Sequence, residues 1–120
     1  MDPLQRIEVQ RLAILDSLKA IRSMRRGAIS EQYFPVLRQG QQRAERRGPY
    51  YVLSRHQGSK TISQRLTSPE ALQQARNDIE AFKRFQALCR EFERLTEQMG
   101  ELERGQEKKR SKSWSSKTAK

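Results

Sequence analysis

Residues 49–66 read PYYVLSRHQGSKTISQRL, and this stretch decides the fold. Residues 50–55 and 60–66 are rich in aromatic and β-branched side chains, which favour strands. Residues 56–59 lie between the two runs and include a glycine and a serine, which suit a tight turn. The sequence therefore predicts an antiparallel β-hairpin.

The second strand of this hairpin has two different faces. Successive strand residues point to opposite sides, so Ile62 and Leu66 face one way while Thr61, Ser63 and Arg65 face the other. The apolar face can rest on helices, and the opposite face is polar and basic. Because an isolated two-stranded ribbon is marginal in water, we expect helices to support it.

Residues 4–24 predict an amphipathic helix before the hairpin. Apolar side chains recur there at heptad spacing, and only Arg11 interrupts them. Asp2 offers an N-cap, Pro3 suits the first helical position, and Gly27 supplies a stop signal after two arginines. We expect the helix to be bounded by these signals.

A longer helix is predicted after the hairpin. Residues 67–70, Thr-Ser-Pro-Glu, fit either a capping box from the threonine or a serine cap followed by proline. The apolar positions form two runs, which a three-residue step between Phe82 and Phe85 offsets. The distal run is a predicted seam for a partner helix, composed of Phe85, Leu88, Phe92, Leu95, Met99 and Leu102. Because this helix outruns the first one, the seam predicts a homodimer or a partner protein; fraying beyond Gly100 is the alternative.

The predicted fold is mainly α with a small β-hairpin, in the order α-β-β-α. Residues 28–47 lack clear periodicity and are predicted to form a partly anchored loop. We expect residues 1–104 to form a single helical domain with the hairpin inserted at about 49–66, and residues 105–120 to form a disordered basic tail. A single cysteine and the lack of an apolar leader or membrane span predict a cytoplasmic protein.

The positive charge is concentrated in two zones. Residues 38–65 carry a net charge of +6 and residues 105–120 carry +5, whereas 1–37 (+2) and 66–104 (−2) are nearly balanced. Arginine dominates the first zone, and its guanidinium makes bidentate contacts to phosphate or guanine. The candidate nucleic-acid-binding residues are Arg38, Arg43, Arg46, Arg47, Tyr50, Tyr51, Arg55, Lys60, Arg65, Lys108, Lys109 and Arg110.

The residue types that an enzyme needs are missing. The chain has one histidine, His56, and one cysteine, Cys89, with no phosphate-binding glycine loop and no metal-ligand spacing. We therefore predict a non-enzymatic protein without a cofactor, a metal or a small-molecule substrate.

The charge and the hairpin predict a nucleic-acid-binding accessory protein, for DNA or RNA. An arginine-rich loop and the hairpin would contact the phosphate backbone, with Arg55, Lys60 and Arg65 on the outer face of the ribbon. Of Tyr50 and Tyr51, one is expected to pack inward and the other to stack on bases. The alternative is a helical protein–protein adaptor or oligomerisation module that binds through its long helix. A membrane-surface role for the tail is a minor alternative, because no amphipathic helix adjoins it.

Residues 26–30 (RGAIS) and 48–55 (GPYYVLSR) resemble a family of small uncharacterised prokaryotic proteins often found near mobile elements. The likeness continues through residues 58–61 (GSKT) and a helix with a Phe-rich face at 79–92, about two-thirds of the chain. Many members of that family carry a cysteine cluster before the GPYY segment, which suggests a metal knuckle. Residues 38–47 hold no cysteine here, so the resemblance implies no metal site in this chain.

Overall fold

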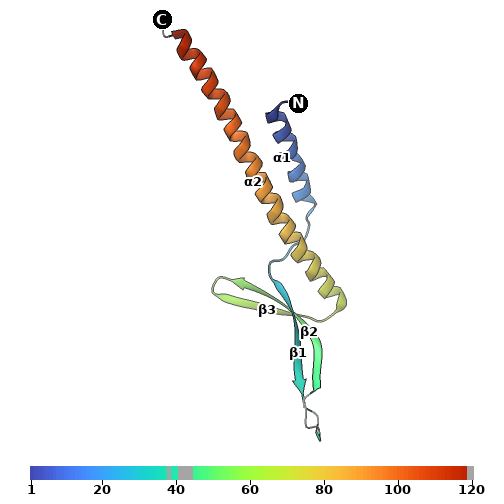
Figure 1. Ribbon diagram of the computed structural model, residues 1–120. Coiled ribbons are helices and arrows are strands. Elements are labelled where there is room, and N and C mark those ends of the chain that lie inside the picture. Colours follow the sequence, from blue (N-terminus) through green and yellow to red (C-terminus); the bar gives the residue numbers. More distant parts are fainter. Residues whose placement is uncertain (38, 41–44, 119–120) are drawn as a thin grey trace. The chain divides into compact units, whose positions relative to one another are not determined.

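The computed structural model describes residues 1–37, 39–40 and 45–118, and the side chains of all of these except 36, 45–46 and 110–118 (Figure 1). Its elements are α1 (Pro3–Ala20), β1 (Ala28–Val36), β2 (Glu45–Gln57), β3 (Lys60–Leu66) and α2 (Pro69–Thr118). The chain divides into two compact units. The helical unit is Met1–Arg22 with Arg84–Lys120, and the sheet unit is Ser23–Lys83.

The first helix begins where the sequence predicted. The Asp2 carboxylate accepts a hydrogen bond from the Gln5 backbone N–H at 2.8 Å, and the Gln5 side-chain oxygen accepts one from the Asp2 backbone N–H at 3.4 Å. This reciprocal capping box stabilises the first turn. The helix ends at Ala20 rather than near residue 24, because Ile21 is extended, with φ −78° and ψ 109°. Gly27 therefore lies beyond the helix and is not its stop.

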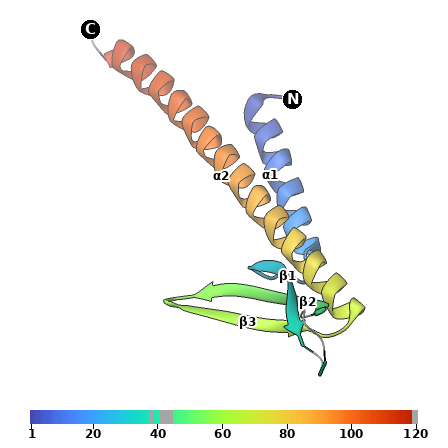
Figure 2. The same cartoon turned by 60° about the horizontal axis from the view of Figure 1, so that its bottom comes forward.

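The core of the helical unit forms between α1 and the distal part of α2, which lie side by side in Figures 1 and 2. Ile7, Ile14 and Leu95 are buried there, and the residues packed on them are Leu18, Leu88, Phe92, Met99 and Leu102. The seam that the sequence predicted for a partner helix thus packs on α1 of the same chain, with the exception of Phe85, which is half-buried outside this core. The apolar seam ends at Leu102, the last of its residues that packs on this core.

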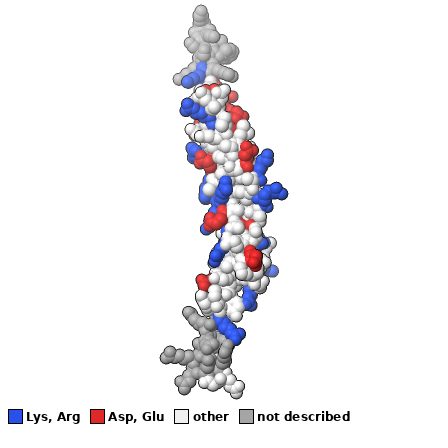
Figure 3. All heavy atoms as spheres, turned by 90° about the vertical axis from the view of Figure 1, so that its right-hand side faces the viewer, with Lys and Arg blue, Asp and Glu red and all other residues white. Residues whose placement is uncertain are grey.

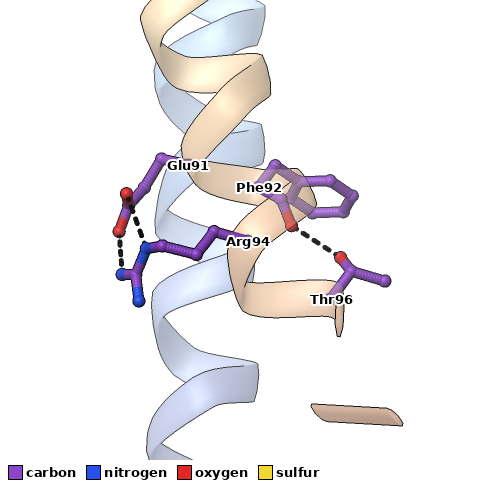
Figure 4. Close-up of polar contacts among 4 residues, drawn as sticks. All are labelled: Glu91, Phe92, Arg94 and Thr96. Carbon is purple, nitrogen blue, oxygen red and sulfur yellow. Dashed lines mark hydrogen bonds and ion pairs between the residues drawn. The ribbon is translucent and has the colours of Figure 1, made fainter. Parts of the chain in front are cut away.

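Arg11, which interrupts the apolar spacing of α1, is accommodated at this interface. Its guanidinium lies 4.8 Å from the centre of the Phe92 ring, and its nitrogens donate to Thr96 Oγ1 at 3.1 Å and to the Met99 sulfur at 3.2 Å. The Thr96 hydroxyl donates in turn to the Phe92 carbonyl at 2.7 Å (Figure 4). Arg11 is therefore a polar contact that fixes how the two helices align.

An exposed ion pair lies one turn away on α2. The Arg94 guanidinium donates two hydrogen bonds to the Glu91 carboxylate, as Figure 4 shows. Hydrogen bonding between the two side chains, reinforced by the attraction of their charges, lowers the pKa of Glu91 and raises the pKa of Arg94.

The sheet unit contains three antiparallel strands in the order β1-β2-β3. The predicted hairpin is confirmed as β2 and β3, joined by a two-residue turn in which Gly58 has a φ of +64°. The prediction of a loop at residues 28–47 was wrong over Ala28–Val36, which forms β1. Pairing supplies the reason, since β2 extends back to Glu45 and offers β1 a full antiparallel edge.

One face of the sheet packs on the first turns of α2. Leu53, Leu66 and Ala75 form the buried core, and the side chains around it are Ile29, Tyr51, Leu72 and Ile79. Ala75 is 0% exposed, so the helix can approach the strands closely. The Ser68 hydroxyl accepts a hydrogen bond from the Ala71 backbone N–H at 3.0 Å, so Ser68 is the cap of α2 and Pro69 its first residue.

A buried carboxylate ties the segment before β1 to α2. Asp78 is 2% exposed and accepts hydrogen bonds from the Ser23 hydroxyl at 2.6 Å and the Gln74 amide at 2.9 Å. Arg25 Nε lies 3.0 Å from Asp78 Oδ2, an ion pair in which the N–H does not point at the oxygen, and the Arg25 backbone N–H donates to the Asp78 carbonyl at 3.0 Å. Asp78 therefore holds the chain in place at the entry to the sheet.

The last element departs from the sequence prediction. We expected residues 105–120 to be disordered, and α2 instead continues through residues 105–118. The reason is intrinsic propensity, because the glutamine, glutamate, lysines and arginine of 106–110 favour helix even though the segment lacks an apolar face. No helix among the described residues is both long and apolar enough to cross a membrane.

Candidate nucleic-acid interface

The two adjacent tyrosines of β2 have different environments. Tyr51 packs against the sheet-unit core and is half-buried. Tyr50 points to the opposite side of the sheet, where the Arg65 guanidinium lies 4.1 Å from its ring centre. The ring of Phe34 meets Tyr50 edge-on, with centroids 5.0 Å apart and an angle of 62°. Tyr50 is thus the tyrosine on the side away from the core.

Four residues of this side form what we call the outer face: Phe34, Arg47, Tyr50 and Arg65. Arg47 is exposed and lies opposite Phe34 in the register of β1 and β2. A register shift between Gln32 and Phe34 brings these two residues into line with Tyr50, because an irregularity re-aims the side chains that follow it. The face combines two aromatic rings with two cations.

The chemistry of the outer face suits a nucleic-acid strand. A guanidinium held over a tyrosine ring can still donate its N–H groups to phosphate oxygens. Phe34 beside it is 50% exposed, and the face of an exposed aromatic ring can stack on a base without requiring a particular sequence.

Two of the predicted hairpin contacts lie on the other face of the sheet. Arg55 and Lys60 were expected beside Arg65 on the outer side. Arg55 is two residues from Leu53, and Lys60 is two residues from Ile62, so both share the side that carries the core. The alternation of strand side chains is the physical reason for this correction.

The structure describes only some of the other predicted nucleic-acid-binding residues. Arg38 and Arg43 lie outside the described residues. Arg46 lies in β2 and Arg110 in α2, but their side chains are also outside the described set. Lys108 and Lys109 are exposed on α2 and belong to the helical unit.

A second basic group, which the sequence analysis missed, lies on the core side of the sheet beyond Leu53. It is a recess of about 330 Å³, lined by Arg25, Arg26, Leu53, Arg55, Ile62 and Gln64. A second recess of about 350 Å³ shares two of these arginines, and its lining consists of Arg26, Gly27, Ala28, Ser54, Arg55, His56 and Thr61. The arginines at 25 and 26 had been interpreted as cations at a helix end. The glycine that follows these two arginines was the only sequence signal that could have indicated their position at a recess.

The positive charge is shared between the units. The sequence of the sheet unit holds eleven basic and five acidic residues, and the helical unit holds fourteen basic and nine acidic residues, with eight of each up to residue 104. On the face seen in Figure 3, basic and acidic side chains are interspersed, and no patch of a single sign extends across it. The sheet unit therefore carries a net charge of +6, and the excess of the helical unit comes from residues after 104.

No metal site is evident in the part of the chain that the structure describes, where no three His, Cys, Asp or Glu side chains gather closely enough to hold an ion. Comparisons with protein-family models, with curated proteins and with solved structures found no match to this chain. The resemblance to the prokaryotic family stays a prediction from the sequence.

Proposed function

We propose that the sheet unit binds nucleic acid through its outer face, with the arginines on the phosphate backbone and the aromatic rings against the bases. The observation that carries this proposal is the position of Tyr50, which lies away from the core between Phe34 and the guanidinium of Arg65.

The charge of the sheet unit supports the same function. Its excess of six positive charges favours polyanions in general, and each arginine that neutralises a phosphate releases condensed counterions. A polyanion made of carboxylates offers nothing for the rings of Tyr50 and Phe34 to stack on. Nucleic acid is the partner that uses both parts of the face.

The adaptor alternative has less support. It relied on a free seam along α2, and that seam packs on α1 around Leu95. We therefore do not propose it as the function.

The test is fluorescence anisotropy of a labelled single strand and a labelled duplex, titrated with the full chain at several salt concentrations. The paired substitutions Arg47→Ala and Arg65→Ala remove two outer-face cations. The matched control, Arg90→Ala with Arg104→Ala, removes two exposed arginines from the helical unit. We expect the outer-face pair to reduce the salt slope on a duplex by about two and the control pair to leave it unchanged.

Tyr50→Ala tests the stacking contribution. We expect it to weaken single-strand binding about tenfold without changing the salt slope, since stacking is worth about 1–3 kcal/mol per base. Equal losses in the outer-face and control pairs would show that binding depends on net charge alone and would contradict the proposal.

The exposed lysines of α2 have a separate test. Lys108→Gln with Lys109→Gln is expected to slow association at low salt and to leave the effect of Tyr50→Ala intact, because charges outside the contact face steer encounter without specifying contacts.

A further inference from the structure

We propose that Arg26 and Arg55 form a binding site for a phosphate monoester, on the opposite side of the sheet from the outer face. We call this site the arginine pocket. It stands on residues that the proposed function does not use, and its ligand is either a small phosphate compound or the phosphorylated end of a nucleic-acid strand.

The first argument is the convergence of the two arginines. Arg26 comes from the segment before β1 and Arg55 from β2, and both line the recess of about 330 Å³ on the core side of the sheet. The lining of this recess includes no acidic residue. A volume of this size accommodates a phosphate together with the group that bears it.

The second argument is that these two charges are not compensated. Arg25 is paired with the buried Asp78 and is thereby committed to the fold. Among the described residues neither Arg26 nor Arg55 forms an ion pair. Arg55 donates one long hydrogen bond, at 3.5 Å, to the side chain of Gln57. Two arginines that line one recess without an ion-pair partner match a dianion better than a single negative charge, and a phosphate monoester carries about −1.5 to −2 at neutral pH.

The third argument is preorganisation. The Arg26 guanidinium lies 5.1 Å from the centre of the Phe82 ring, which orients its plane and leaves its N–H edges available. Gly27 has a φ of +131°, and a Cβ atom there would lie 2.5 Å from the Ser54 carbonyl oxygen. The glycine thus allows the segment that carries Arg26 to lie directly against the strand that carries Arg55.

The walls of the recess favour an anion. Leu53 and Ile62 contribute apolar surface, which lowers the local dielectric and strengthens each ionic contact. Gln64 supplies a side-chain amide that can donate to a phosphate oxygen.

The experiment compares a 5′-phosphorylated single strand with the same strand ending in a 5′-hydroxyl, by anisotropy with a 3′ label on the full chain. Calorimetric titration with inorganic phosphate and with adenosine monophosphate covers the small ligands. Arg26→Gln and Arg55→Gln are the test variants, and Arg65→Gln on the outer face is the matched control. Tyrosine fluorescence of each variant in a Trp114→Phe background verifies that the sheet unit is folded.

If the site takes strand ends, we expect the 5′-phosphate to improve affinity about tenfold, with the improvement lost in both test variants and kept in Arg65→Gln. If it takes small phosphates, adenosine monophosphate or inorganic phosphate will bind to the parent and to Arg65→Gln but not to the test variants. Absence of both effects in the parent, or their persistence in the folded test variants, would overturn the arginine pocket. A failure of the proposed function is distinguished by another result. If the outer face does not bind nucleic acid, Arg65→Gln will bind the 5′-hydroxyl strand with the same affinity as the parent.

Discussion

Replacing Asp78 with alanine should destabilise the sheet unit more than any other removal of a single charge from it. The substitution deletes a carboxylate that is 2% exposed, together with the hydrogen bonds from Ser23 and Gln74 and the ion pair with Arg25. The backbone hydrogen bond from Arg25 to the carbonyl of residue 78 survives, because it does not involve the side chain. The loss is therefore confined to side-chain contacts.

The magnitude follows from what the former partners do afterwards. Breaking a buried ion pair costs about 3–5 kcal/mol when the remaining charge stays buried. Here the side chain of Arg25 is 40% exposed, and Ser23 and Gln74 are exposed, so all three can be solvated again. We therefore expect Asp78→Ala to lower the free energy of unfolding by about 2–3 kcal/mol. This range lies below about 3–5 kcal/mol because water can solvate the three former partners.

The assay uses fluorophores that the sequence separates between the units. All three tyrosines lie within Ser23–Lys83, whereas Trp114 does not, so Trp114→Phe gives a background in which tyrosine fluorescence reports on the sheet unit alone. Urea unfolding in that background measures Asp78→Ala. The control is Glu80→Ala on the same helix, whose side chain is 76% exposed and which should change stability by less than about 0.5 kcal/mol. Losses for Asp78→Ala and Glu80→Ala that agree within that margin would refute this account of Asp78.

Three further predictions concern the helical unit. Leu95→Ala, at 2% exposure, should cost about 3 kcal/mol of stability by chemical denaturation, and Leu12→Ala, at 56%, less than about 0.5; similar losses would contradict the assigned core. Arg11→Met should keep stability within about 1 kcal/mol but broaden the interhelical NMR signals, whereas a large loss would show that the polar contacts dominate. Arg94 lowers the pKa of Glu91 below its ordinary value of 4.5. The Glu91–Arg94 pair therefore contributes to folding stability above pH 4.5, and this contribution is lost as the pH falls through the lower pKa of the folded state. Unfolding curves of the parent and Glu91→Gln should therefore converge in acid, and a constant difference would exclude this pair as the cause.

The parts of the fold that could be predicted from the sequence are those set by short-range chemistry. The cap at Asp2, the start of α2 at Ser68 and the turn at Gly58 each depend on residues only a few positions apart. β1 could not be predicted in this way, because its strand character depends on pairing with a distant segment and because Pro35 argues against a strand locally. Helix at residues 106–110 was missed because composition was weighed above helix propensity.

The candidate sites show the same division. Alternation along β2 predicted that Tyr50 and Tyr51 would face opposite ways, but only the packing of Tyr51 on the core determined which one faces outward. The same alternation, applied to Arg55, would have placed it with Leu53 rather than with Arg65. Arg26 could not be identified, since its relation to Arg55 depends on a close approach of two chain segments that no local pattern encodes.

The three-residue step in the apolar pattern of α2, between Phe82 and Phe85, has a consequence for amide hydrogen exchange. The helix has one continuous series of backbone hydrogen bonds, yet the residues before the step belong to the core of Leu53 and those after it to the core of Leu95. Amides exchange through the opening of whichever core protects them. We expect two plateaus of protection along this single helix, and a destabilising substitution in either core should lower one plateau while the other keeps its height.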